Sequence, residues 1–323
     1  MIKKISLLVL SLTLLTACSL PGLGGSVKGN DIIIASGNTS ERQILTQIIA
    51  QMIEREMPDV DVEIINNLGS SVLIFQAIMG ENANLGSAMY TGTSLLGELG
   101  MEPILDADET FEAVVEGYYK RFDTTWFPSY GFENTYAFMV RKDFAAKHNL
   151  KTVTDLEVLA SDLKVGIDPG WIDRQLDGYE NFKINYDFEF GNVYPMEIGL
   201  VYSALESEQL QVSLGYSTDG RIDAFDLVVL EDDKGHFPSY AVSPVVSNAL
   251  LEQYPQLQSI LLKLEDAISL EKMQAMNRAS DELNIEPALV AKQFLIDNDY
   301  FSDVEDRLLS EIPLYSKLQK GGQ

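Results

Sequence analysis

Between residues 31 and 79 the chain twice repeats one pattern, in which a short apolar or alternating stretch, a polar loop and apolar side chains at helical spacing follow one another. The short apolar run 31–35 leads into the polar loop 36–41, and the alternating run 60–64 leads into the polar loop 66–71. Both loops contain residues that favour turns and helix N-caps. This order is typical of an α/β fold with a parallel sheet, whose ligands bind where such loops meet the helices.

A second set of α/β elements follows further along the chain. Strands are predicted near residues 135–140, 163–168, 212–215 and 226–230, and the chain beyond residue 255 is almost wholly helical. We therefore predict two α/β lobes joined by crossing strands, with a ligand cleft between them. The first lobe would contain residues 31–137 and 231–323, and the second, inserted lobe residues 138–230.

The N-terminus predicts export and a lipid anchor. Residues 1–17 combine a positive start with an apolar run too short for a permanent membrane helix, as in a signal peptide. The segment Leu15-Thr16-Ala17-Cys18 spans the end of this stretch and resembles the lipobox of bacterial lipoproteins, which implies cleavage before Cys18 and a lipid on its thiol. The alternative is a plain signal peptide with an incidental buried cysteine. Residues 18–30, rich in Gly, Ser and Pro, are predicted to be a flexible tether at the extracytoplasmic face of the cell membrane.

Charge and rare residue types exclude several classes of function. Asp and Glu number 49 against 23 Lys and Arg, and the formal net charge of −26 disfavours nucleic acid and anionic lipid as partners. One cysteine and two histidines exclude a disulfide framework and a Cys- or His-rich metal site, and we expect no cofactor. Neither His148 nor His236 has a nucleophile signalled beside it, and no Gly-x-Ser-x-Gly or phosphate-binding motif occurs, so we expect no enzyme.

Four of the 14 tyrosines stand at informative places. Tyr90, Tyr136 and Tyr216 lie near predicted strand ends or loops, where an α/β sheet binds its ligand, and Tyr202 lies in a predicted helix over 196–205. A single tyrosine more often packs in a core or an interface than lines a ligand site. Position alone therefore does not group these four residues into one site.

Six segments, taken in order, carry a resemblance to a known family. They are residues 90–93, 131–137, 167–169 with Arg174 and 177–178, 196–202, 216–222 and 227–234. Over residues 31–297 the chain resembles the glycine betaine/carnitine/choline-binding proteins of bacterial ABC importers. The most specific parts are Ser-Thr-Asp-Gly-Arg-Ile at 217–222 and Leu-Val-Val-Leu-Glu-Asp-Asp at 227–233.

The resemblance implies a type II periplasmic-binding-protein fold whose two lobes close on a ligand. It also implies a quaternary ammonium ligand held by Tyr90, Tyr136, Tyr202 and Tyr216, and a monomer that serves an ABC permease and its ATPase. A trimethylammonium group cannot donate an N–H bond but is attracted to aromatic faces, by about 0.5–2 kcal/mol for each ring. Rings drawn from both lobes would couple binding to closure.

Two departures from the family affect the choice of ligand. Gly37 stands where relatives usually carry a lysine that can hold a ligand carboxylate, and Met89 stands where they often carry a glutamate. Arg174 is then either a carboxylate partner or a structural residue. Choline needs no cation, and its hydroxyl could bond to polar residues of the loops, for which the candidates are Ser36, Asn38, Ser70, Ser71 and Thr91.

Two other functions stay open on the sequence alone. The same fold could bind another small solute, such as an amino acid, if the four tyrosines do not converge. A surface-anchored hydrolase could instead use a pair of the many carboxylates, although no motif supports it.

Overall fold

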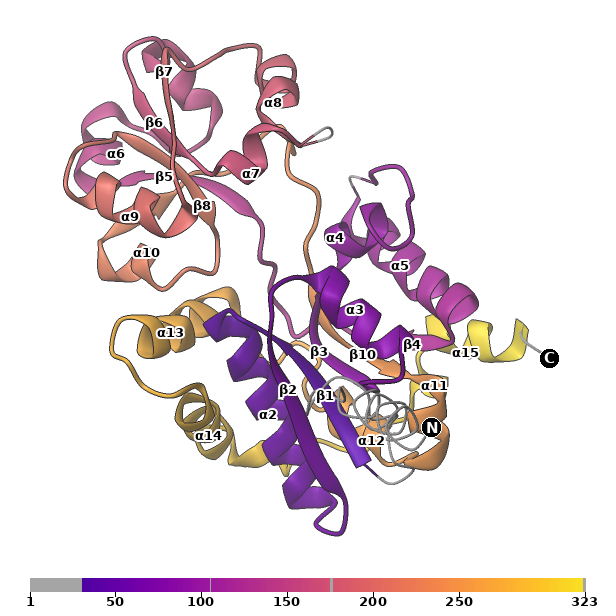
Figure 1. Ribbon diagram of the computed structural model, residues 1–323. Coiled ribbons are helices and arrows are strands. Elements are labelled where there is room, and N and C mark those ends of the chain that lie inside the picture. The colour runs from indigo at the N-terminus through magenta and orange to yellow at the C-terminus, as the bar shows by residue number, and fades with distance from the viewer. Residues whose placement is uncertain (1–30, 105, 175–176, 322–323) are drawn as a thin grey trace, which may run out of the picture.

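Two α/β lobes make up the part of the chain that the computed structural model describes, which is residues 31–104, 106–174 and 177–321 (Figure 1). The predicted signal peptide, Cys18 and the tether all lie outside these described residues. Within the described residues, no helix combines the length and the apolar character needed to cross a bilayer.

The first lobe is built on a five-stranded sheet of order β2-β1-β3-β10-β4. Its first three strands are parallel, and β10 runs antiparallel to both of its neighbours. The strands are β1 (Asp31–Gly37), β2 (Asp61–Leu68), β3 (Leu85–Tyr90), β4 (Thr124–Trp126) and β10 (Val242–Ser247). Its helices are α2 (Ser40–Glu56), α3 (Ser71–Met79), α4 (Thr91–Leu96), α5 (Ala107–Phe122), α11 (Asn248–Gln253), α12 (Leu257–Leu262), α13 (Leu270–Asp281), α14 (Pro287–Asp297) and α15 (Pro313–Gly321), with short 3-10 turns at Asp299–Phe301 and Leu309–Glu311.

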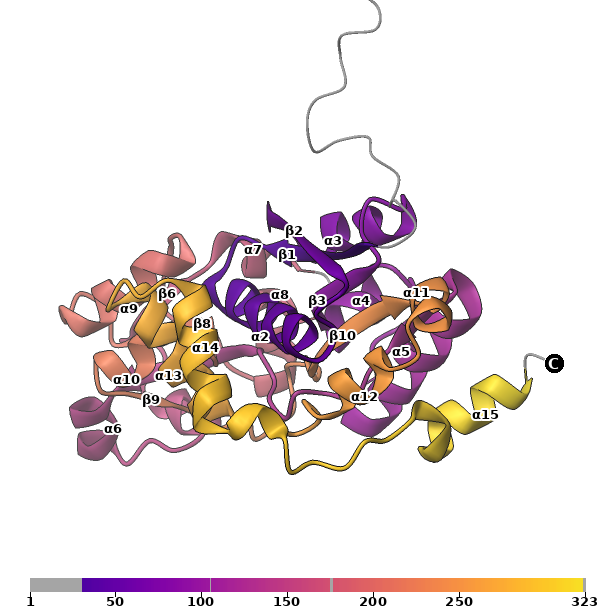
Figure 2. The same ribbon diagram turned by 90° about the horizontal axis from the view of Figure 1, so that it is seen from below.

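Both predicted polar loops end in a helix N-cap. The Thr39 hydroxyl accepts a hydrogen bond from the backbone N–H of Arg42 at the start of α2, and the Ser70 hydroxyl accepts one from Leu73 in α3. Helix α2 then buries its apolar side on the sheet, and α14 packs beside it (Figure 2). The strand–loop–helix pattern expected over residues 31–79 is thus confirmed.

Strand β10 is a central strand that the sequence pattern does not predict, because Pro244 stands in its middle. The register of β10 against β3 shifts between Ser243 and Val245, and this bulge takes the proline out of the regular ladder. The Pro244 carbonyl still accepts a hydrogen bond from the backbone N–H of Phe127 at 2.9 Å. Because β10 follows the strands of the second sheet in sequence, the chain re-enters the first sheet there.

The second lobe is built on a five-stranded sheet of order β7-β6-β8-β5-β9, in which β5 is antiparallel to β8 and β9. The strands are β5 (Tyr136–Arg141), β6 (Lys164–Ile167), β7 (Asn192–Pro195), β8 (Val212–Tyr216) and β9 (Leu227–Val229). Around it lie α6 (Lys142–His148), a 3-10 turn (Thr154–Leu159), α7 (Pro169–Ile172), α8 (Tyr179–Tyr186), α9 (Ile198–Glu206) and α10 (Arg221–Ala224). Phe138, Trp171 and Phe182 are fully buried in its core.

Two segments, 127–135 and 230–241, connect the lobes and meet in a β-bridge between Glu133 and Ala241 (Figure 1). The expected α/β class and the two sheets are confirmed. The expected boundaries at 137/138 and 230/231 stay a prediction, because the residues of the connections lie largely outside both sheets.

Candidate functional site

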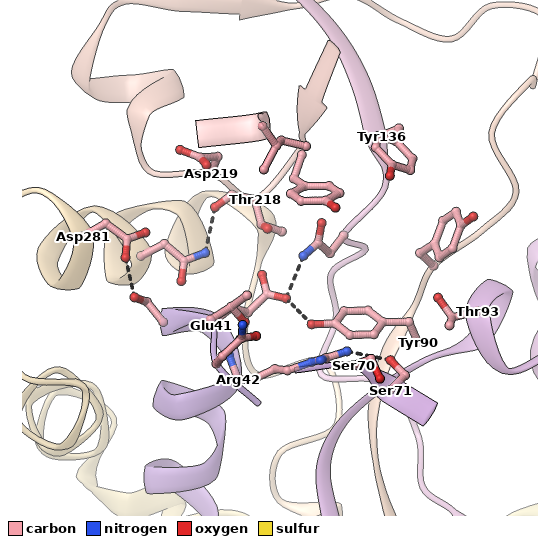
Figure 3. Close-up of a pocket in the computed structure, with 18 of the residues that line it drawn as sticks. Glu41, Arg42, Ser70, Ser71, Tyr90, Thr93, Tyr136, Thr218, Asp219 and Asp281 are labelled. Atoms are coloured by element: carbon pink, nitrogen blue, oxygen red, sulfur yellow. Dashed lines mark hydrogen bonds between the residues drawn. The ribbon is translucent and has the colours of Figure 1, made fainter. Parts of the chain in front are cut away.

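A pocket of about 740 Å³ lies between the two lobes (Figure 3). The first lobe contributes the N-terminal ends of α2 and α3 and the end of β3. The second lobe contributes the start of β5, the end of β8 and the loop that follows it. Loops at strand ends therefore form this site, as the α/β pattern predicts.

Four tyrosine rings line the pocket: Tyr90, Tyr136, Tyr216 and Tyr240. Tyr136 and Tyr216 are register partners in antiparallel strands, which holds their ring centroids 5.2 Å apart. Burial is the main cause that raises the pKa of all four phenols. The rings therefore stay neutral at physiological pH and keep the electron-rich faces that attract cations.

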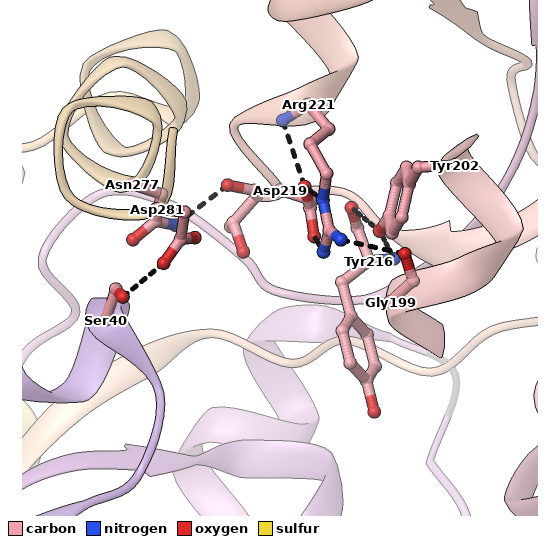
Figure 4. A network of polar contacts seen from close by, with 9 residues as sticks. Ser40, Gly199, Tyr202, Tyr216, Asp219, Arg221, Asn277 and Asp281 are labelled. Atoms are coloured by element: carbon pink, nitrogen blue, oxygen red, sulfur yellow. Dashed lines mark hydrogen bonds and ion pairs between the residues drawn. The ribbon is translucent and has the colours of Figure 1, made fainter. Parts of the chain in front are cut away.

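Tyr202, the fourth tyrosine expected in the site, does not line the pocket. It lies fully buried behind β8, where its hydroxyl accepts a hydrogen bond from the backbone N–H of Tyr216 at 2.8 Å. A Cβ at Gly215 would lie 2.4 Å from that hydroxyl, so the glycine makes room for it. The Arg221 guanidinium covers the ring at 4.3 Å from its centroid (Figure 4). In this structure Tyr202 supports the strand that carries Tyr216.

Asn38, Ser71 and Arg174, also expected in the site, line the pocket, whereas Ser36 and Thr91 do not. The Ser36 hydroxyl accepts a hydrogen bond from Thr46 at 2.8 Å. The Thr91 hydroxyl donates to the backbone carbonyl of Ser239 at 3.1 Å. Both hydroxyls thus hold the loops around the pocket in place.

The first turn of α2 brings two opposite charges to the pocket. The Glu41 carboxylate accepts hydrogen bonds from the Tyr90 hydroxyl at 2.8 Å and from the Asn134 amide at 2.9 Å. The Arg42 guanidinium donates to the Ser71 hydroxyl at 2.6 Å and lies over the Tyr90 ring, 4.9 Å from its centroid (Figure 3). Both side chains are buried.

The other two arginines of the pocket are ion-paired. Arg174 donates to Asp177 at 2.6 Å and to the Tyr240 hydroxyl at 2.7 Å. Arg221 pairs with Asp219 at 2.6 Å (Figure 4). These bonds set the side chains of the second-lobe wall before any ligand arrives.

Helix α13 of the first lobe contacts the loop that follows β8. The Asn277 amide donates to the backbone carbonyl of Thr218 at 2.8 Å, and the Gln274 amide donates to that of Ser217 at 2.7 Å. Asp281 at the end of α13 accepts a hydrogen bond from Ser40 (Figure 4). One side of the cleft is therefore joined across the lobes.

Sequence reasoning missed Tyr240, Glu41, Arg42 and Asn134 as lining residues. Glu41 and Arg42 follow an N-cap in a predicted ligand-side loop, which is a signal that could have found them. Tyr240 had no such signal, because it precedes the unpredicted strand β10. Among the described residues, no group of three or more His, Cys, Asp or Glu side chains could hold a metal ion.

Comparison with known proteins finds relatives over most of the chain. The chain is 45% identical over 295 residues to the carnitine transport binding protein OpuCC of Listeria monocytogenes, covering 91% of this chain and 95% of that protein. It is 29% identical to a glycine-betaine-binding protein of Pseudomonas aeruginosa, over 90% of this chain and 95% of the relative. A crystal structure described as a glycine betaine/carnitine/choline ABC transporter matches with a TM-score of 0.82 and 47% identity, over 84% of this chain and 100% of that one.

The family model for the substrate-binding domain of ABC-type glycine betaine transport systems matches residues 30–297. The solved relatives confirm the expected type II periplasmic-binding-protein fold. Because the relatives are transport binding proteins, the expectation of a binding protein and not an enzyme is confirmed as well. The chain belongs to the family of substrate-binding domains of ABC-type glycine betaine transport systems.

Proposed function

We propose that the cleft binds a quaternary ammonium compound, namely choline, glycine betaine or carnitine, and that the protein delivers it to the permease of an ABC importer. The observation that carries the proposal is the meeting of four neutral tyrosine rings in one pocket. Each ring face attracts a methylated cation by about 0.5–2 kcal/mol. The relatives named for carnitine and for glycine betaine bind ligands of this class.

The rings come from different parts of the fold. Tyr90 lies in the first lobe, Tyr136 and Tyr216 lie in the second, and Tyr240 lies in a connecting segment. A cation held between them stabilises the closed arrangement of the lobes, which is the state that a permease can distinguish from the empty protein. In this proposal Tyr240 is the fourth ring of the site in place of Tyr202, which the family resemblance implied, and Tyr202 supports Tyr216 through a hydrogen bond.

Titration calorimetry with matched ligands tests the proposal. Glycine betaine and glycine differ only in the three N-methyl groups, and choline and ethanolamine differ in the same way. The methylated member of each pair should bind at least about tenfold more tightly, because only it fills an aromatic box without needing N–H acceptors. Equal affinity within a pair, or tighter binding of amino acids such as proline or glutamate, would contradict it.

We also propose that Cys18 carries the lipid anchor, that residues 18–30 tether the body, and that the protein works as a monomer at the extracytoplasmic face, with the permease and its ATPase as partners. The lipobox-like sequence supports the anchor. In the producing bacterium, Cys18→Ser should move the protein from the membrane fraction to the soluble fraction. Retention in the membrane fraction after that substitution would contradict the anchor.

A further inference from the structure

Of the three arginines that line the pocket, one differs from the others in its charge partners. Arg174 and Arg221 each form an ion pair with an aspartate, both at 2.6 Å. Arg42 forms no ion pair with any described residue, although its side chain is only 8% exposed. A buried cation without a counter-charge is costly, and proteins keep one where something else supplies the negative charge.

The hydrogen bonds of Arg42 are also incomplete. A guanidinium has five N–H donors, and those of Arg42 reach two side-chain hydroxyls, that of Ser71 from Nη2 at 2.6 Å and that of Tyr90. Its Nε is buried and has no hydrogen-bond partner among the described residues. The guanidinium lies in the lining of the cleft, over the face of the Tyr90 ring (Figure 3). Such an arrangement leaves donors for an anion that enters the cleft.

The loop before α2 is shaped around this side chain. A Cβ at Gly37 would lie 2.2 Å from Cδ of Arg42 and 3.1 Å from Nη1, so any larger residue at 37 collides with the arginine. The backbone at Gly37 does not require glycine, because its φ is not in the left-handed region. Space for Arg42 is therefore what the glycine provides.

The opposite charge contacts the same tyrosine. Glu41 accepts the Tyr90 hydroxyl hydrogen bond through Oε1, and its Oε2 is buried without a partner among the described residues. Glu41 and Arg42 do not form an ion pair with each other. A zwitterion complements both charges, whereas choline complements only the negative one.

We propose that Arg42, with the Ser71 hydroxyl beside it, binds the carboxylate of the ligand, and that the cleft therefore selects carboxylate-bearing quaternary ammonium compounds over choline. This rests on the proposed function and adds to it the residue that determines specificity. The positive charge that the loop lacks at position 37 is supplied from position 42, across the space that Gly37 leaves free.

Calorimetry on three proteins tests this, with glycine betaine and choline as ligands that share the trimethylammonium group and differ in the carboxylate. Arg42→Gln should weaken glycine betaine binding at least about tenfold and change choline binding less than about threefold. The matched control is Arg55→Gln, because Arg55 lies in the last turn of the same helix and also covers a tyrosine, Tyr300, at 4.2 Å, but lies outside the pocket. The control should bind both ligands as the unaltered protein does.

Moving the positive charge from position 42 to position 37 provides a gain-of-function test. Gly37→Lys alone should disturb the loop, whereas Gly37→Lys combined with Arg42→Ala removes the collision and returns a cation to the same space. The double variant should recover glycine betaine binding relative to Arg42→Ala alone. Failure to recover it, in a double variant that unfolds cooperatively, would count against a carboxylate site at this place.

The outcomes separate the two proposals. Equal loss of both ligands in Arg42→Gln, or no loss of either, overturns the role of Arg42, as does tighter binding of choline than of glycine betaine by the unaltered protein. Failure of the unaltered protein to bind any quaternary ammonium compound overturns the proposed function itself. Should Arg42→Gln not fold, glycine betaine methyl ester replaces it as a probe on the unaltered protein. Loss of at least about tenfold in affinity supports the carboxylate site, and equal affinity overturns it.

Discussion

The two walls of the cleft hold their charged side chains in different ways. On the second-lobe wall, Arg174 is fixed by Asp177 and by the Tyr240 hydroxyl, and Arg221 is fixed by Asp219 and by the backbone carbonyl of Gly199. Each positive charge there has a negative partner within the protein. What this wall offers to a ligand is therefore chiefly the faces of its aromatic rings.

On the first-lobe wall the charges are left available. Arg42 has a serine and a tyrosine ring as its neighbours, and one oxygen of Glu41 has no partner among the described residues. Under the proposed function, the two walls would have different roles: the rings would hold the methylated nitrogen, and the first-lobe charges would bind the rest of the ligand. Changes to a ring should then affect all quaternary ammonium ligands alike, and changes to the ion pairs should affect stability more than selectivity.

The largest effect is expected from Tyr136→Ala. Tyr136 contacts Tyr216 and lies under the Arg174 guanidinium, so its loss removes one ring face and loosens the next. Choline and glycine betaine should both bind about 10–100-fold more weakly, as measured by calorimetry. Tyr136→Phe keeps the ring and loses the hydroxyl with its hydrogen bonds to Asp168, at 3.3 Å, and to Tyr216, so it should stay within about threefold of the unaltered protein. A phenylalanine variant as weak as the alanine variant would show that the hydroxyl, and not the ring, holds the ligand.

Asp177→Asn tests whether the ion pairs of the second-lobe wall stabilise the fold without affecting the choice of ligand. Asp177 is buried, and the Arg174 side chain is 32% exposed. The substitution removes the negative charge that pairs with Arg174. We expect a loss of about 2 kcal/mol in the free energy of unfolding, seen as a fall of roughly 5 °C in Tm, with the ratio of glycine betaine to choline affinity unchanged. Asp173→Asn, the same change at an exposed neighbour, is the control. A changed affinity ratio with an unchanged Tm would instead place selectivity on this wall.

Parts of the fold could be predicted from the sequence where neighbouring residues determine the local structure. The N-caps at Thr39 and Ser70 are local, because each hydroxyl accepts from a backbone N–H only three residues further along the chain, and the α/β pattern over 31–79 follows from them. Strand β10 escaped prediction because Pro244 argues against a central strand, and only the bulge against β3 makes it acceptable.

The residues of the site could be predicted where the ends of strands determine which way a side chain points. Tyr136 and Tyr216 face the cleft because one starts and the other ends an antiparallel pair. Tyr202 has the same residue type and a nearby position, but its direction depends on the space left by Gly215 and on the cover provided by Arg221. Sequence spacing does not report either contact.

Position 37 is a second case in which the sequence does not show the path of a side chain. In the sequence, glycine in place of the usual lysine indicates a lost positive charge. In the fold, the side chain of Arg42 passes through the space beside that glycine, so the cleft keeps a cation. A substitution and its compensation five residues apart can be recognised only when the path of the longer side chain is known.

Tyr202→Phe tests whether Tyr202 supports the second-lobe wall or contacts the ligand. The variant leaves the Tyr216 backbone N–H, which is partly buried, without its 2.8 Å acceptor, which costs about 1 kcal/mol. Tm should fall by a few degrees while the affinity for choline stays within about threefold. Tyr194→Phe, at a ring that is 42% exposed on β7, should change neither quantity. A tenfold loss of affinity without a change in Tm would return Tyr202 to the ligand site.

The smallest effect expected is a pH dependence confined to the second wall. His236 is buried, and its Nε2 donates to the backbone carbonyl of Asp177 at 2.9 Å. Burial lowers the pKa of this imidazole below its ordinary 6.5, against the opposing influence of that hydrogen bond and of the Asp232 and Asp177 charges. Because the unfolded chain then takes up a proton before the folded one does, stability is complete above about pH 6.5 and declines as the pH falls from there toward the folded-state pKa.

One histidine can change the free energy of unfolding by at most about 1.4 kcal/mol for each pH unit. Thermal unfolding between pH 7.5 and 5.5 should therefore show a smaller decline in Tm for His236→Gln than for the unaltered protein, whereas His148→Gln, which removes the other histidine, should keep the full decline. Glycine betaine affinity, set on the first wall by Arg42, should not follow this titration. An affinity that falls together with the His236-dependent part of Tm would mean that the two walls respond as one unit, and the difference between their roles would be lost.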